Sequence, residues 1–144
     1  MVKRRYLLDT NILSEPLRPQ PNPMVIRKLQ HYSYELATAT IVWHELWFGC
    51  YRLPVSRKRQ RIEQYLQNVV LPHLPLMPYT QAAAEWHAEE RARLTNIGQA
   101  PPFADAQIAA IAKVNDMIIV TANTSDFDRF ADIAVENWFL SDFE

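Results

Sequence analysis

The sequence contains little cysteine and little glycine. Its 144 residues include one cysteine, Cys50, and two glycines, Gly49 and Gly98. A single cysteine excludes an internal disulfide framework and a zinc cluster built on cysteines, and it fits a reducing compartment, so we expect a cytoplasmic protein. Two glycines exclude a glycine-rich loop of the kind that cradles nucleotide phosphates.

Long apolar runs are also missing. The longest stretch without charged residues, 64–84, is interrupted by Pro72, Pro75 and Pro78, so it does not predict a membrane-spanning helix. The apolar residues near the start are too few for a secretory signal, because Asp9 ends the run at once. We therefore expect neither export nor membrane insertion.

The net charge of −1 conceals an uneven distribution along the chain. Residues 1–72 contain 11 basic and 5 acidic side chains, whereas residues 73–144 contain 4 basic and 11 acidic ones. This balance excludes a uniformly basic coat for nucleic acid. The asymmetry instead indicates charged partners or clustered charged sites.

Short apolar runs alternate with amphipathic segments along the chain. Strands that alternate with helices are typical of one α/β domain, here expected over residues 1–144, with three α/β/α layers and a mainly parallel central sheet. Ligands bind such sheets at the carboxyl ends of the strands. The pattern predicts strands at 6–8, 35–39, 117–120 and 134–135, a strand or extended connector at 74–77, helices at 24–31, 42–51, 56–70, 80–96 and 104–114, and a turn or short helix at 125–130.

Four carboxylates occupy unusual places in this pattern. Asp9 ends the first predicted strand and Asp126 follows the strand at 117–120, with Asp128 as a competitor. Glu45 and Asp105 interrupt apolar helix faces. Each acid alone also has a structural explanation, as a helix cap, a turn residue or half of an ion pair.

Taken together, the four acids predict a site for a hard cation. Clustered carboxylates raise one another's pKa unless a cation neutralises them. Ligation by oxygen alone selects Mg²⁺ or Mn²⁺ rather than zinc. Such ions activate water and stabilise charge on phosphate oxygens, so we expect phosphodiester hydrolysis, with one or two ions.

Three other catalytic motifs are incomplete or absent. His44 and Glu45 begin a zinc-protease H-E-x-x-H pattern, but Phe48 stands where the second histidine is needed. The segment after Asp9 has Asn11 where an aspartyl-phosphate phosphatase has its second aspartate. No G-x-S-x-G motif of a serine hydrolase is present.

Five segments resemble the PIN-domain ribonucleases, and specifically the VapC-type toxins of bacterial toxin–antitoxin pairs. The resemblance extends over nearly the whole chain and implies a PIN-like fold. It rests on LLDTNILSE (7–15), TATIVWHELWFG (38–49), PPFADAQIAAIA (101–112), IIVTANTSDFDRF (118–130) and IAVENW (133–138).

The resemblance implies a Mg²⁺- or Mn²⁺-dependent endoribonuclease that acts as a toxin, forms a homodimer and is neutralised by a VapB-like antitoxin. One departure is Ala122, where many relatives have arginine. A second point to check is whether Asp126 or Asp128 is the fourth ligand. By residue matching, the metal-binding and catalytic quartet would be Asp9, Glu45, Asp105 and Asp126, and the auxiliary polar residues would be Asn11 and Thr121.

A basic cluster follows the segment that contains Glu45. RNA is the natural partner of such a cluster, because phosphate contacts supply most affinity that is independent of base sequence. A solvated helix face is the alternative. Two other functions remain open: a catalytically silent module that binds protein or RNA, and a structure-specific DNA nuclease on the same fold. The cluster consists of Arg52, Arg57, Lys58, Arg59 and Arg61.

Overall fold

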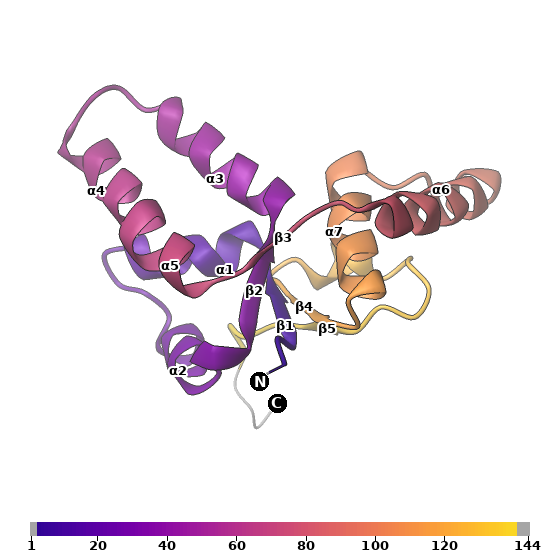
Figure 1. Cartoon of the computed structure of the whole chain (residues 1–144), viewed down its shortest axis with the longest axis horizontal. Helices are drawn as coiled ribbons and strands as arrows, with labels where there is room; N and C mark the ends of the chain where they lie inside the picture. Colours follow the sequence, from indigo (N-terminus) through magenta and orange to yellow (C-terminus); the bar gives the residue numbers. More distant parts are fainter. Residues whose placement is uncertain (1–2, 141–144) are drawn as a thin grey trace.

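A five-stranded parallel sheet forms the centre of the computed structural model, which describes residues 3–140 (Figure 1). The strands lie in the order β3-β2-β1-β4-β5, and every neighbouring pair is parallel. The predicted parallel sheet is therefore confirmed. Its strands are β1 (Tyr6–Leu8), β2 (Leu36–Ala39), β3 (Leu76–Met77), β4 (Ile118–Val120) and β5 (Val135–Glu136).

Helices lie on both sides of the strands, as the three-layer α/β/α prediction requires (Figure 1). None of the helices within residues 3–140 combines the length and the hydrophobicity that a membrane crossing demands. The α-helices are α1 (Thr10–Ser14), α2 (Pro23–His31), α3 (Thr40–Tyr51), α4 (Arg57–Tyr65), α5 (Leu71–His73), α6 (Gln81–Asn96) and α7 (Phe103–Val114); 3₁₀ turns are η1 (Glu15–Leu17), η2 (Ser33–Glu35) and η4 (Thr124–Phe127).

Side-chain caps set where several helices begin. The Ser56 hydroxyl accepts a hydrogen bond from the Arg59 N–H at 3.2 Å and so caps α4. Thr80 caps α6 in the same way, 3.2 Å from the Ala83 N–H. At the other end of α6 the chain turns through Gly98, whose φ of 76° is a left-handed conformation that glycine adopts without a Cβ clash.

The predicted single helix over 56–70 is wrong in its second half. After Tyr65 the chain widens into a π-helical segment, η3 (Leu66–Val70), before the short α5. Pro72 explains the change, because it has no N–H to donate and its ring would clash with the carbonyl four residues earlier in a continuous α-helix. The wider winding avoids that clash.

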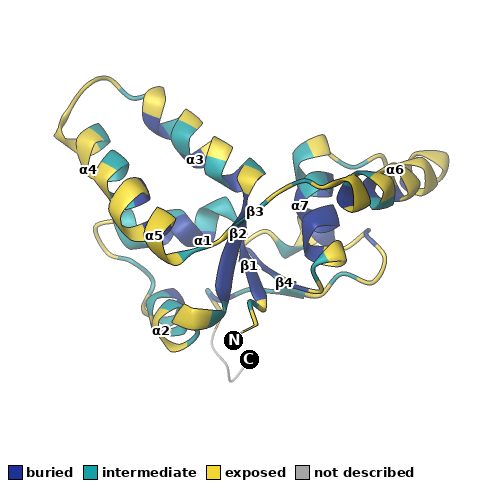
Figure 2. Cartoon of the chain, viewed as in Figure 1, coloured by how far each residue is buried: buried dark blue, intermediate teal, exposed yellow. Residues whose placement is uncertain are grey.

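The core is apolar and lies on both faces of the sheet. All three β1 residues are buried, and α7 is buried on every side from Ile108 to Ala112, where it packs mainly against α6 and also contacts α3 and β4 (Figure 2). Near the sheet edge, Trp138 is fully buried and contacts Tyr6 edge-on at 5.1 Å. In contrast, α4 has no buried residue.

The strand order creates a switch point at β1. The chain passes from β1 to β2 and β3 on one side, then returns to place β4 on the other side of β1. Leu8 pairs with Val120, so the residues that follow, Asp9 and Thr121, emerge side by side at the carboxyl edge. This crevice is where open α/β sheets bind ligands.

A buried carboxylate ties α6 to the segment after η4. Glu90 is only 6% exposed, accepts two hydrogen bonds from Arg93 at 2.7 and 2.9 Å, and accepts a third from the Ala131 N–H at 3.0 Å. The hydrogen bonds from Arg93 are the main reason why the Glu90 pKa lies below its usual value, and burial opposes them.

We expect Glu90→Gln to lower the free energy of unfolding at pH 7 by about 2 kcal/mol, because charge-assisted hydrogen bonds are lost. The depressed pKa makes this contribution complete above the ordinary glutamate pKa of 4.5 and lost as the pH falls through the folded-state pKa. Chemical denaturation at several pH values measures it. Glu89→Gln, at the exposed neighbouring residue, is the control. If Glu90→Gln lowers the free energy of unfolding no more than Glu89→Gln does, Glu90 does not stabilise the fold as proposed.

Candidate functional site

Asp9 caps α1 and faces the switch point at the same time. One carboxylate oxygen accepts the Thr10 N–H at 2.8 Å, and the other accepts the Thr121 hydroxyl at 2.9 Å. Burial raises the pKa of Asp9, and the charge of Asp126 adds to the rise, whereas these hydrogen bonds oppose it. The structural role as a cap therefore holds, and it orients the carboxylate at the edge of the sheet.

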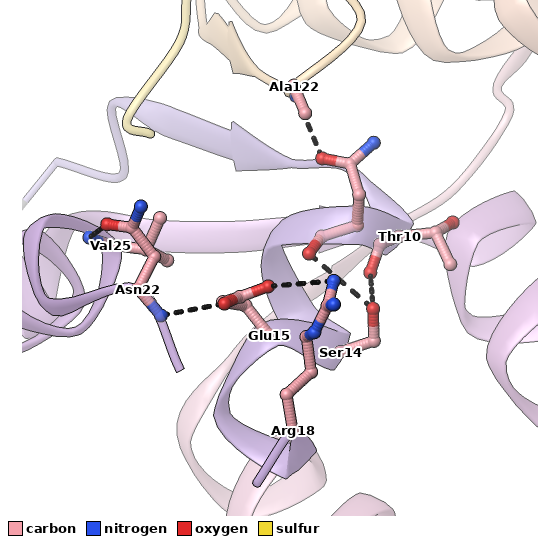
Figure 3. Close-up of polar contacts among 8 residues, drawn as sticks. Thr10, Ser14, Glu15, Arg18, Asn22, Val25 and Ala122 are labelled. Carbon is pink, nitrogen blue, oxygen red and sulfur yellow. Dashed lines mark hydrogen bonds and ion pairs between the residues drawn. The ribbon is translucent and has the colours of Figure 1, made fainter. Parts of the chain in front are cut away.

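The auxiliary residues Asn11 and Thr121 join the ends of β1 and β4. The fully buried Thr121 hydroxyl donates to Asp9 and accepts from the Asn11 amide at 3.3 Å and the Asn123 N–H at 3.0 Å. The side-chain amide oxygen of Asn11, Oδ1, accepts a hydrogen bond from the Ala122 N–H at 2.9 Å (Figure 3). Ala122 thus contributes its backbone, so the side chain that departs from the family pattern is not needed for this network.

Asp105 lies in the first turn of α7 and belongs to the same electrostatic group. Burial, followed by the negative charges of Asp126 and Asp9, raises the pKa of Asp105 to about 6. A carboxylate at a helix N-terminus is ordinarily stabilised by the helix dipole. The rise shows that desolvation and repulsion outweigh that stabilisation here.

The structure distinguishes Asp126 from Asp128. Asp126, in η4, is the residue whose charge raises the pKa of both Asp9 and Asp105. Asp128 instead lines a separate hollow of about 510 Å³, together with Gly98 and Ser125. The charge effects therefore group Asp126 with Asp9 and Asp105.

Glu45 is a partly exposed side chain on α3. Its side chain on α3 is 46% exposed, and its partner is His44, with Nδ1 3.8 Å from the carboxylate. The apolar neighbours in the sequence suggested a buried charge, but the helix face turns the carboxylate outward into solvent. The main charge effects on the pKa values of Asp9 and Asp105 come from other residues, chiefly Asp126.

The carboxylate oxygens of these acids are ligands that a hard cation prefers, but the side chains are not close enough together to hold one as they stand. Among residues 3–140, no three Asp, Glu, His or Cys side chains lie close enough to hold a metal ion as they stand. Burial is the main reason why the pKa values of Asp9 and Asp105 are raised, and the negative charge of Asp126 adds repulsion at both. A divalent cation bound by carboxylate oxygens would remove that repulsion, so the residues fit Mg²⁺ or Mn²⁺.

Arg129 acts on one of the acids, although the sequence did not indicate a role for it. Arg129 lowers the pKa of Asp105 against the larger effects that raise it. Its guanidinium donates to the Gln99 carbonyl at 3.5 Å, which fixes it near the turn before α7. The available signal was a basic residue three positions after Asp126 in an otherwise acidic segment.

The predicted basic cluster divides into two groups. Arg59 is used internally: it donates to Glu63 at 3.0 Å and to the Leu53 carbonyl at 3.2 Å, and Arg52 lies over the Phe48 ring, 5.1 Å from its centroid. The other three, Arg57, Lys58 and Arg61, line one hollow beside α1.

We expect Thr121→Val to raise the pKa of Asp9 further, because the variant removes the hydroxyl that donates to the carboxylate. The free energy of unfolding should fall by about 1–3 kcal/mol, since buried polar groups lose their partner. NMR titration of the Asp9 side-chain carbon measures the pKa, with exposed Thr95→Val as control. An unchanged Asp9 pKa would show that the hydrogen bond has no electrostatic effect.

Comparison with known proteins finds relatives that match this chain over nearly its whole length. Toxin FitB of Neisseria gonorrhoeae is 34% identical over 134 residues, which cover 91% of this chain and 96% of that protein. The VapC ribonuclease Y4jK of Sinorhizobium fredii is 28% identical over 135 residues, which cover 92% of this chain and 96% of that protein.

Solved structures and family models give the same assignment. The crystal structure of FitAcB from Neisseria gonorrhoeae contains a chain that superposes with a TM-score of 0.86 at 33% identity, covering 94% of this chain and 99% of that chain. A family model described as the PIN domain matches residues 6–133. The chain therefore belongs to the PIN-domain family.

Proposed function

We propose that this chain is a Mg²⁺- or Mn²⁺-dependent endoribonuclease. The observation that carries the proposal is the electrostatic coupling of Asp9, Asp105 and Asp126 at the switch point, where α/β sheets bind ligands. Such a cluster calls for a hard cation, and a hard cation held by carboxylates acts on phosphate oxygens. The ribonuclease name of the Sinorhizobium relative supports RNA as the substrate.

The chain's own residues have separable tasks in this reaction. Asp9, Asp105 and Asp126 would hold the cation, with Glu45 joining from α3. When bound, the cation would activate a water molecule and stabilise charge on the phosphate and the leaving oxygen. Thr121 and Asn11 orient Asp9 through the bonds that join β1 to β4, and Thr10 holds the other Asp9 oxygen. Arg129 limits the charge at Asp105.

The same proposal assigns the chain to a toxin–antitoxin pair. Its relative from Neisseria is named a toxin, which supports growth inhibition as the biological effect. A VapB-like antitoxin is then the expected inhibitor. The homodimer remains a prediction, for which the half-exposed aromatic face of α3, with Phe48 and Tyr51, offers a surface.

We expect the purified chain to cut RNA when Mg²⁺ or Mn²⁺ is present and to stop when EDTA is added. Asp9→Asn should lower the cleavage rate about 100-fold or more, because a charge that holds the cation is lost. Gel analysis of labelled RNA measures the rate. Cleavage that continues in EDTA, or at an unchanged rate with Asp9→Asn, would contradict the proposal.

A matched pair of variants tests the assignment within the acidic segment. Asp126→Asn should lose cleavage as Asp9→Asn does, whereas Asp128→Asn should retain it, because the charge of Asp126 acts on both Asp9 and Asp105. DNA and RNA of the same sequence are compared in parallel. Preferred cleavage of DNA would favour the DNA nuclease, and RNA binding without any cleavage would favour the silent module.

A further inference from the structure

A basic hollow of about 700 Å³ lies between the end of α1 and the start of α4. Four of its eight lining residues are basic, and none of the eight is acidic. Leu17, Pro19 and Ile62 provide apolar surface beside these charges. The hollow therefore combines several cations with a surface on which a flat apolar group can lie. The basic residues are Arg18, Arg57, Lys58 and Arg61.

Two of these cations have no partner within residues 3–140. Arg57 and Lys58 are exposed and make no hydrogen bond or ion pair among the described residues. Arg61 donates to the Leu17 carbonyl at 2.9 Å, which holds η1 against α4. Arg18 reaches back toward the buried Glu15, 3.8 Å away, while 70% of its side chain stays exposed (Figure 3).

Helix stability does not explain the charges on α4. Its first turn contains Arg57, Lys58 and Arg59 and no acidic residue. Positive charges at this end of a helix oppose the macrodipole, so they are unfavourable to folding. Arg59 has an internal role, but Arg57 and Lys58 do not. Their effect is directed outward, toward an anion in the hollow.

The hollow continues along α4, and at Ser14 it borders the helix that Asp9 caps. A second hollow of about 660 Å³ shares Arg18, Pro19 and Arg61 with the first and extends to Asn68. At the other end, Ser14 lines the first hollow. Ser14 is four residues after Thr10 on α1, which is about 6 Å at the helical rise of 1.5 Å per residue. The same strand of nucleic acid can therefore reach both places.

We infer that this hollow is a subsite for the backbone of single-stranded RNA, outside the scissile phosphate. Arg18, Arg57 and Lys58 contact phosphates, and a base or ribose lies on Leu17 and Pro19. The inference rests on the proposed ribonuclease function. RNA fits better than an acidic peptide, because it offers regularly spaced phosphates together with flat apolar faces, and the hollow presents both kinds of surface.

The salt dependence of RNA binding tests this subsite without any cleavage. Each phosphate contact to a single strand contributes about 0.7 to the slope of log affinity against log salt. Anisotropy of a short labelled RNA of mixed sequence, measured in EDTA, should give a slope smaller by about 0.7 for Lys58→Ala. The double variant with Arg18→Ala should lose about twice that amount. Exposed Lys113→Ala, on α7, should leave the slope unchanged.

The outcomes separate the subsite from the proposed reaction. Equal slopes for wild type, Lys58→Ala and Lys113→Ala overturn the subsite, even if wild type cuts RNA with Mg²⁺. Reduced slopes without any cleavage support the subsite and count against the ribonuclease. Labelled polyglutamate that binds as tightly as RNA and loses affinity in the same variants would assign the hollow to an acidic protein instead. Melting temperatures should stay equal or rise for Lys58→Ala, which excludes unfolding as the cause.

Discussion

Repulsion among three carboxylates at one edge of the parallel sheet is the interaction on which the account of this protein depends. Asp9 and Asp105 are partly desolvated, and Asp126 adds its charge to both, so the pKa values of Asp9 and Asp105 are raised. Carboxylates with strongly raised pKa values are concentrated at functional sites of proteins. The pairing of β1 with β4 fixes the geometry, because it brings Asp9 and Thr121 together in register.

The other residues of the site counter part of the repulsion among these carboxylates. Thr121 and the Thr10 N–H occupy both oxygens of Asp9, and Asn11 connects the two strand ends. Arg129 counters part of the charge at Asp105. The basic hollow between α1 and α4 begins at Ser14. The basic residues that would attract phosphate and the acidic residues therefore lie on separate surfaces. This separation reconciles a net charge of −1 with a nucleic-acid substrate.

The sequence predicted the sheet and three members of the acidic group because these depend on local patterns. Buried strands are apolar runs; Asp9 follows the first one directly, and Asp126 lies in the turn after the fourth. The outward position of Glu45 was not predictable, since it depends on how α3 is rotated about its axis. The basic hollow was not predictable either, because it forms only where α1 and α4 come together. One contact between them is the hydrogen bond from the Tyr65 hydroxyl to the Leu13 carbonyl at 2.7 Å, and no spacing in the sequence indicates it.

The most direct test of the central claim compares the stability of wild type and Asp105→Asn with and without a divalent cation. At pH 8, above the Asp105 pKa of about 6, the metal-free variant should be the more stable protein, because one repelling charge is gone. Added Mn²⁺ should stabilise wild type strongly and the variant weakly, so their order reverses. Thermal unfolding measures both. A variant that is less stable than wild type in metal-free buffer, or equal stabilisation by Mn²⁺, would contradict the account.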